Sequence, residues 1–135
     1  MNNKLQISKE HLSRSYEFLQ DSILTFMNNS FNTSINRAYY SVFHAMCACL
    51  CLKYSDFSKH SFIIAKFREE YIKSKIFDVR LSSIIEYLSD YRNDCDYNVA
   101  FKANYDIAYK GVEDAKYFYK CVTEYINNIK LQIES

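Results

Sequence analysis

A short stretch around Arg92 holds residue types that could do chemistry together. Arg92 and Asn93 are followed by Asp96 and Tyr97. A guanidinium can hold a phosphate through two parallel hydrogen bonds, so the stretch could bind a phosphate group. However, Arg92 also stands four residues before Asp96, and on a helix such a pair forms a surface ion pair that stabilises by a few tenths of a kcal/mol. From the residues alone, the surface ion pair is the favoured interpretation.

A second set of polar side chains lies half a chain earlier. Arg37, Tyr40 and His44 are three and four residues apart, so on a helix they share one stripe. In a structural interpretation, His44 is a hydrogen-bonded imidazole in the core or an interface, and Arg37 pairs with a neighbouring helix. In a functional interpretation, the stripe lies beside Arg92 and contributes to binding.

The remaining histidines and the cysteines offer fewer possibilities. His60 stands where a helix is expected to begin; it could be exposed there, or it could line the Arg92 site and act as a proton shuttle. His11 is expected in solvent. His44, Cys47 and Cys51 align at i, i+3 and i+7, but on one straight helix they span too far for a single tetrahedral ion. We therefore expect small buried thiols, with no metal and no cofactor.

Composition restricts the fold. The 135 residues include one glycine, Gly111, and no proline, whereas all-β folds need turn residues every few positions. Glycine-rich phosphate loops are excluded as well, so any phosphate must be held by side chains. The 17 basic and 16 acidic residues nearly cancel, which argues against strong non-specific attraction to nucleic acid or membranes.

The sequence also predicts the compartment. No apolar run approaches the roughly 20 residues of a membrane span, and the first twelve residues lack the apolar core of a signal peptide. The number of cysteines is odd, five, and three of them lie within Cys47–Cys51. This usage is typical of reduced thiols, so we expect a cytoplasmic protein that does not contact membranes.

Apolar periodicity predicts one domain over residues 1–135, an all-α antiparallel bundle of four to five helices. We expect helices from a cap at Ser8 to about residue 26, from Thr33 or Ser34 to about Tyr54, over Phe62–Tyr71, over about 78–96, and from Asn104 or Asp106 to the end. The breaks fall at 28–32, Ser55–Ser58 and 98–104. Gly111 lies inside the last helix, where it predicts the close approach of another helix.

Four strings taken together resemble one family. They are Asn36-Arg37-Ala38-Tyr39-Tyr40-Ser41-Val42-Phe43-His44-Ala45, the segment from Lys59-His60-Ser61 to Phe67, Arg92-Asn93-Asp94-Cys95-Asp96-Tyr97, and Ala115-Lys116-Tyr117-Phe118. In this order they are similar to HEPN domains, which are helical bundles often linked to nucleotidyltransferases. The resemblance implies a homodimer formed through the helices that carry the Arg92 motif. It also implies a toxin–antitoxin or defence pair, in which many such domains are metal-independent ribonucleases.

The sequence departs from the ribonuclease motif of that family at one point. The motif ends in histidine, but Asp96 and Tyr97 stand in that stretch and no histidine follows His60. Reference pKa values of about 3.9 for Asp and about 10 for Tyr suit neither residue to proton transfer near pH 7. In some HEPN toxins a tyrosine near the motif is adenylylated by the partner, a role that the resemblance extends to Tyr97.

Three functions remain open. The leading one is binding of nucleotide or RNA phosphate at a dimer cleft around Arg92, Asn93, Asp96 and Tyr97, with Arg37, Tyr40, His44 and His60 nearby. The first alternative is an active ribonuclease with Arg92 as phosphate clamp and Tyr97 or His60 as proton shuttle. The second is a non-catalytic helical adaptor that docks a nucleotidyltransferase.

Overall fold

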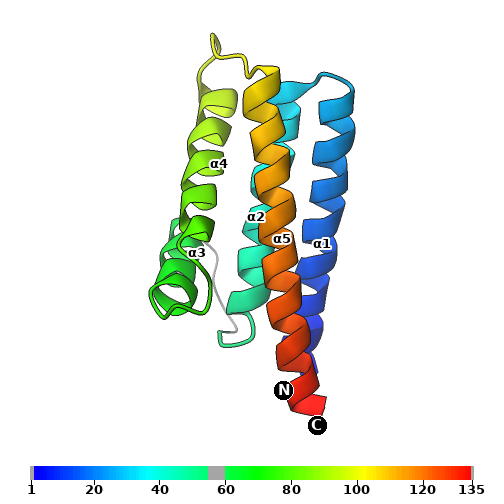
Figure 1. The fold of residues 1–135 in the computed structure, drawn as a ribbon, viewed down its shortest axis with the longest axis vertical. Coiled ribbons are helices and arrows are strands. Elements are labelled where there is room, and N and C mark those ends of the chain that lie inside the picture. Colours follow the sequence, from blue (N-terminus) through cyan, green and yellow to red (C-terminus); the bar gives the residue numbers. More distant parts are fainter. Residues whose placement is uncertain (1, 55–59, 135) are drawn as a thin grey trace.

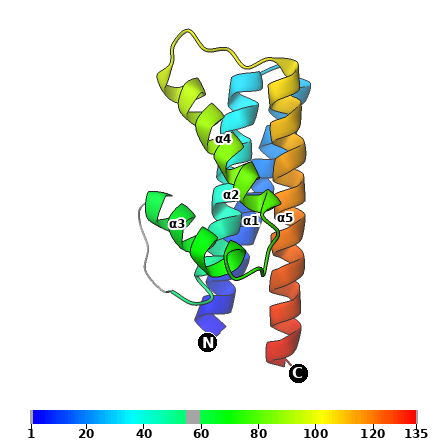
Figure 2. The ribbon, with the colours of Figure 1, turned by 60° about the vertical axis from the view of Figure 1, so that its left-hand side comes forward.

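The computed structural model describes residues 2–54 and 60–134. These residues form α1 (Asn2–Met27), α2 (Phe31–Leu50), α3 (His60–Phe67), a π-helical turn η1 (Arg68–Ile72), α4 (Arg80–Tyr97) and α5 (Tyr105–Glu134), and they contain no strand. Helices α1, α2 and α5 run along the long axis, and α3 and α4 cover one side of them (Figures 1 and 2). The predicted all-α antiparallel bundle is confirmed.

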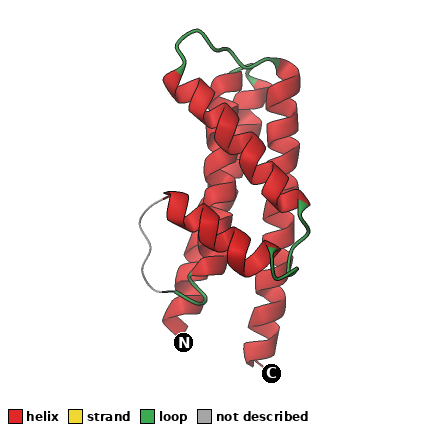
Figure 3. Cartoon of the chain, turned by 90° about the vertical axis from the view of Figure 1, so that its left-hand side faces the viewer, coloured by secondary structure: helices red, strands yellow, loops and turns green. Residues whose placement is uncertain are grey.

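Helix α2 is the centre of the bundle. It packs against α1, α3, α4 and α5, and every residue from Ala45 to Leu50 is buried. A helix that is apolar on all sides must be covered on all sides. The shorter α3 and α4 lie one after the other along the side that Figure 3 turns towards the viewer, and they complete this cover.

Helices α1 and α2 meet along a line of small residues that recur every seven positions, which we name the serine seam. Two serine pairs exchange hydrogen bonds across the seam. In one pair, Ser15 Oγ donates to the Ser41 carbonyl at 2.6 Å and Ser41 Oγ donates to the Ser15 carbonyl at 2.9 Å. Because the hydroxyls bond to backbone, the two helices must lie very close together. The seam consists of Ser8, Ser15 and Ser22 in α1 and Ser34, Ser41 and Ala48 in α2, all with no exposed surface.

The seam explains two errors in the predicted helix starts. Ser8 does not cap α1, which already begins at Asn2; its hydroxyl instead donates to the Ala48 carbonyl at 2.7 Å. Ser34 is likewise inside α2, whose N-cap is Ser30. A serine hydroxyl can hydrogen-bond to a backbone group at its own helix end or in a neighbouring helix. Here both hydroxyls donate to carbonyls of the neighbouring helix. The break predicted at Ser55–Ser58 falls largely outside the described residues.

The start of the last helix and the position of its glycine agree with prediction. Asn104 Oδ1 accepts a hydrogen bond from the Ile107 amide at 2.9 Å, as a cap does. A Cβ on Gly111 would lie 2.8 Å from Ile35 Cδ1 of α2 and 3.4 Å from Leu88 Cδ2 of α4. Close helix approach therefore explains a mid-helix glycine that costs about 1 kcal/mol relative to alanine.

The serine seam gives a stability prediction. Ser15→Leu should lower the free energy of unfolding by roughly 2 kcal/mol or more, because an added side chain forces the two backbones apart. Ser15→Ala should cost about 1 kcal/mol, the scale of one lost hydrogen bond. Urea denaturation followed by circular dichroism measures both. Ser13, exposed on the same helix, supplies the control: if Ser13→Leu and Ser15→Leu destabilise equally, the seam is not a close contact.

Candidate functional site

The Arg92 side chain lies across the aromatic face of α2. Its Cζ is 4.5 Å from the ring centre of Tyr39 and 5.8 Å from that of Tyr40. Tyr39 is 1% exposed, and the Arg92 side chain itself is only 15% exposed. A guanidinium on a ring face is attracted by the ring's negative charge density. Helix α4 therefore sets its arginine into the bundle surface rather than out into solvent.

Burial opposes the charge of Arg92, but Tyr39, Tyr40 and Asp96 favour it and raise the pKa of the guanidinium; its hydrogen bonds are nevertheless incomplete. Arg92 Nη1 lies 3.4 Å from Asp96 Oδ2, the i, i+4 pair that the spacing predicts. That distance is long for a charge-assisted bond, and the Asp96 side chain is 32% exposed. Arg92 Nε is buried and has no hydrogen-bond partner among the described residues. The Nε–H group is therefore a buried donor that a ligand could satisfy.

His60 belongs to the same group of side chains although α3 supplies it. Its Nδ1 is 3.3 Å from the Tyr39 hydroxyl, and its ring centre is 4.0 Å from that of Phe43. Burial lowers the pKa of His60, and the Arg92 charge lowers it further. Burial also raises the pKa of Tyr39, against the opposing effect of Arg92. We call Arg92, Asp96, Tyr39, Tyr40 and His60 the Arg92 cluster.

A shallow pocket continues from the cluster between α2 and α4. Its volume is about 270 Å³, and Arg37 and Asp96 both contribute to its wall. Arg37 Nη1 donates to Asn36 Oδ1 at 2.8 Å, which orients a second guanidinium at this wall. The complete lining is Asn32, Thr33, Asn36, Arg37, Cys95 and Asp96.

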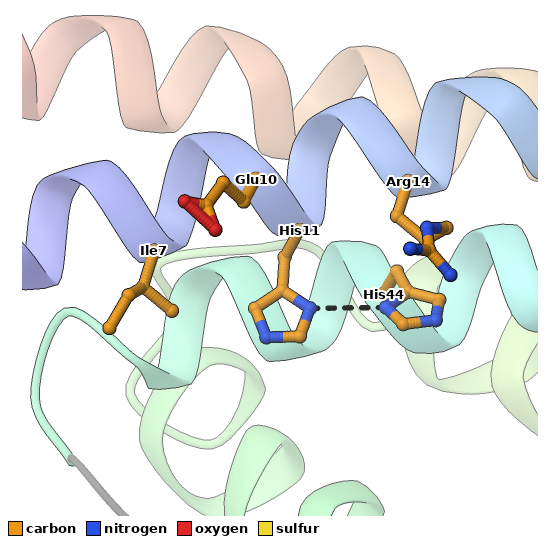
Figure 4. A pocket seen from close by; sticks show the side chains of 5 residues that line it. All are labelled: Ile7, Glu10, His11, Arg14 and His44. Carbon is orange, nitrogen blue, oxygen red and sulfur yellow. Dashed lines mark hydrogen bonds between the residues drawn. The ribbon is translucent and has the colours of Figure 1, made fainter.

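The other predicted site residues lie apart from the cluster or at its edge. Asn93 is exposed on α4, and Tyr97, at the end of α4, is 78% exposed. His44 turns towards α1, where its Nδ1 lies 3.0 Å from Nδ1 of His11 (Figure 4). The expectation that His11 is in solvent is wrong, because it is half-buried in this pair. The structure thus brings together Arg37, Tyr40, His60, Arg92 and Asp96.

The three clustered thiols lie in the core of the bundle and do not line the pocket, unlike Cys95. Cys47, Cys49 and Cys51 are buried and free, as predicted. Burial raises the pKa of Cys47 to about 12 and that of Cys51 to about 11, so both are protonated and unreactive near pH 7. In the described part of the chain, no group of three or more His, Cys, Asp or Glu side chains could hold a metal ion.

The sequence reasoning missed Tyr39 as a part of the site. Tyr39 was named only within the string that carries the resemblance, and the structure shows that its side chain is buried. The signal was the adjacent pair Tyr39-Tyr40, which gives a helix two neighbouring rings across which one long cation can lie. Which cationic side chain lies over the two rings depends on how α4 crosses α2. The spacing of residues within one helix does not determine this crossing.

The fold and the site together define a class of protein: a small helical bundle with an arginine set on the aromatic face of its central helix. The chain belongs to the HEPN domain family, whose model matches residues 8–129. The predicted resemblance is confirmed. No helix within the described residues is long and apolar enough to cross a membrane.

Three relatives are consistent with this assignment. A UPF0332 protein of Thermotoga maritima is 27% identical over 130 residues, which cover 96% of this chain and 98% of the relative. A UPF0332 protein of Pyrococcus horikoshii is 40% identical over 70 residues, 52% of this chain and 44% of its own. A protein of Methanocaldococcus jannaschii named as a candidate toxin is 28% identical over 91 residues, 67% of this chain and 62% of its own.

The shared surroundings of Arg92 and His60 give a pKa prediction. Arg92→Met keeps an unbranched side chain over Tyr39 but removes the charge, so the pKa of His60 should rise. An NMR pH titration of the imidazole signals measures it. Arg80 is the matched control: it also lies on α4 and over a ring, 3.8 Å from the centre of Tyr117. Arg80→Met should leave the pKa of His60 unchanged. If Arg92→Met also leaves it unchanged, the charge of Arg92 does not act on His60.

Proposed function

We propose that this HEPN-domain protein is one component of a toxin–antitoxin or defence pair and binds the phosphate of a nucleotide or RNA at the Arg92 cluster. The observation that carries the proposal is the Arg92 guanidinium itself, which is largely buried on two tyrosine rings with Nε unsatisfied. A phosphate would supply the strong hydrogen bonds that the bundle does not. The toxin-named relative supports the biological setting.

The surroundings of Arg92 suit a phosphate ester better than a carboxylate metabolite. Arg37 lies in the wall of the adjoining pocket and adds a second fork of donors, so two neighbouring phosphates of a chain could be held. The contacts with the rings of Tyr39 and Tyr40 hold the Arg92 guanidinium in place before any ligand arrives, which reduces the entropy cost of binding. Asp96 competes for the same guanidinium, so an entering phosphate must displace it.

In this proposal two copies associate through the α4 surfaces, and their Arg92 clusters share one cleft. The exposed Tyr97 ring at the end of α4 is a suitable contact for such an interface, because exposed tyrosines are enriched where proteins meet. A nucleotidyltransferase is the proposed protein partner. Equilibrium sedimentation of the purified chain tests the dimer, with twice the mass of one chain as the supporting result.

Binding assays test the proposed ligand. Titration of the protein into fluorescently labelled single-stranded RNA and into a labelled nucleoside triphosphate should give saturable binding to at least one of them. Arg92→Ala should weaken it by roughly tenfold or more, the scale of a lost charge-assisted hydrogen bond, and the salt dependence should become shallower. Arg80→Ala, on the same helix, should bind as the unaltered protein does. Equal losses in both variants would contradict the site.

A second candidate function has its own supporting observation. His60 lies within hydrogen-bonding distance of the Tyr39 hydroxyl, and Arg92 lies over the Tyr39 ring. An imidazole and a guanidinium therefore contact the same tyrosine, although the motif histidine is absent. In metal-independent RNA cleavage, the ribose 2′-hydroxyl attacks the adjacent phosphorus and the 5′-oxygen leaves. His60 would take the hydroxyl proton or return one to the leaving oxygen, while Arg92 stabilises the charged phosphate.

Cleavage of RNA in the presence of a chelator distinguishes this candidate from binding alone. If the chain is a ribonuclease, His60→Ala should slow cleavage by roughly a hundredfold, the usual contribution of one acid–base group, while RNA binding persists. Cleavage that survives His60→Ala would exclude His60 as the shuttle and leave Tyr97. If neither RNA nor nucleotide binds but a co-expressed nucleotidyltransferase does, the chain acts as an adaptor.

A further inference from the structure

The imidazoles of His11 and His44 face one another across the serine seam. Their Nδ1 atoms are 3.0 Å apart and their rings are stacked, with centres 5.3 Å apart. Two nitrogens at this distance can share one proton only if one imidazole donates and the other accepts. The pair therefore offers two inward-directed nitrogen lone pairs, one of them occupied by a removable proton.

We propose that the Nδ1 atoms of His11 and His44 bind a divalent transition-metal ion of the Zn²⁺ or Ni²⁺ type, with the imidazole that carries the shared proton on Nδ1 changing to the tautomer that carries it on Nε2. Imidazole nitrogen is a preferred ligand of these ions, with a metal–nitrogen distance of about 2.0–2.1 Å. Two such ligands of a tetrahedral ion stand roughly 3.4 Å apart, so the rings must move slightly apart and turn until both Nδ1 lone pairs point at the same ion.

The two helices hold both ligands in place before any ion arrives. In α1, His11 lies between Ser8 and Ser15, and in α2, His44 lies between Ser41 and Ala48. Hydrogen bonds of the serine seam fix the backbone on both sides of the pair. A site whose ligands are held by rigid elements loses little entropy on binding. The ring of Phe18 stacks on His44 at 5.5 Å and fixes its orientation further.

Space and charge around the pair are compatible with an ion. The imidazoles open into a shallow pocket of about 240 Å³ that Ile7, Glu10 and Arg14 also line (Figure 4). Water would occupy the remaining coordination positions. Glu10 favours a cation, whereas Arg14 opposes it; both side chains are exposed, so solvent screens them.

Isothermal titration of the full chain with Ni²⁺, and separately with Zn²⁺, tests the proposal. We expect saturable binding of one ion per chain. His11→Ala and His44→Ala should each weaken binding at least roughly tenfold, since even groups that only orient a ligand contribute this much. The chain has three histidines, so His60→Ala is the matched control and should bind as before. Binding that persists in His11→Ala or His44→Ala, or no saturable binding, overturns the proposal.

A second measurement needs no variant and so does not depend on variants that fold. Paramagnetic Ni²⁺ added in small amounts should broaden the NMR signals of the His11 and His44 imidazoles and leave those of His60 sharp. Broadening of all three rings, or of none, would also overturn the proposal. Zn²⁺ that binds only through Cys95 or Cys121, the half-buried thiols, would leave the imidazole signals unshifted and is likewise a contradicting result.

Discussion

Reciprocal hydrogen bonds between serine hydroxyls and backbone carbonyls hold α1 and α2 together, and much of the molecule depends on this contact. Ser15 and Ser41 bond in both directions, and so do Ser22 and Ser34. The contact leaves no room for larger side chains, so the register of the two helices is fixed at three points along their length. With α1 in place, α2 keeps only its other faces free for α3, α4 and α5. The aromatic pair Tyr39-Tyr40 is on the part of α2 that α4 crosses, and this crossing creates the site.

A second close contact determines where α4 lies. Gly111 of α5 lies against Ile35 of α2 and Leu88 of α4 at once, so three helices converge on the one residue without a side chain. Leu88 is one helical turn before Arg92, and the depth at which α4 sits here determines whether the guanidinium reaches the tyrosine rings. The composition that excluded glycine phosphate loops therefore has a second consequence. The single glycine serves helix packing, and in the proposed function a phosphate is held by an arginine side chain, Arg92, on a helix that this packing positions.

The sequence predicted what depends on local pattern and missed what depends on how helices face each other. Apolar periodicity gave the five helical segments, and Asn104 and Gly111 were interpreted correctly because a cap and a close approach each leave a local signature. Ser8 and Ser34 were misread as caps, since a serine hydroxyl that caps and one that crosses to a neighbour look alike in sequence; the seven-residue spacing of Ser8, Ser15 and Ser22 was the discriminating signal. Arg92, Asp96 and His60 were named as site residues, but Tyr39 and the pairing of His11 with His44 follow only from tertiary packing.

The position of Asp96 bears on what kind of ligand the Arg92 cluster would favour. Asp96 lies 3.4 Å from the guanidinium and is partly exposed, so it neutralises Arg92 incompletely and can move away at little cost. A monoanion would gain little by replacing it, because one carboxylate would be exchanged for one anion of similar charge. A phosphate of higher charge, or two adjacent phosphates that also reach Arg37, would gain more than the displaced pair loses. Under the proposed function, the cluster should therefore bind polyphosphate or paired phosphodiester groups better than single weak anions, and Asp96 would contribute to that preference.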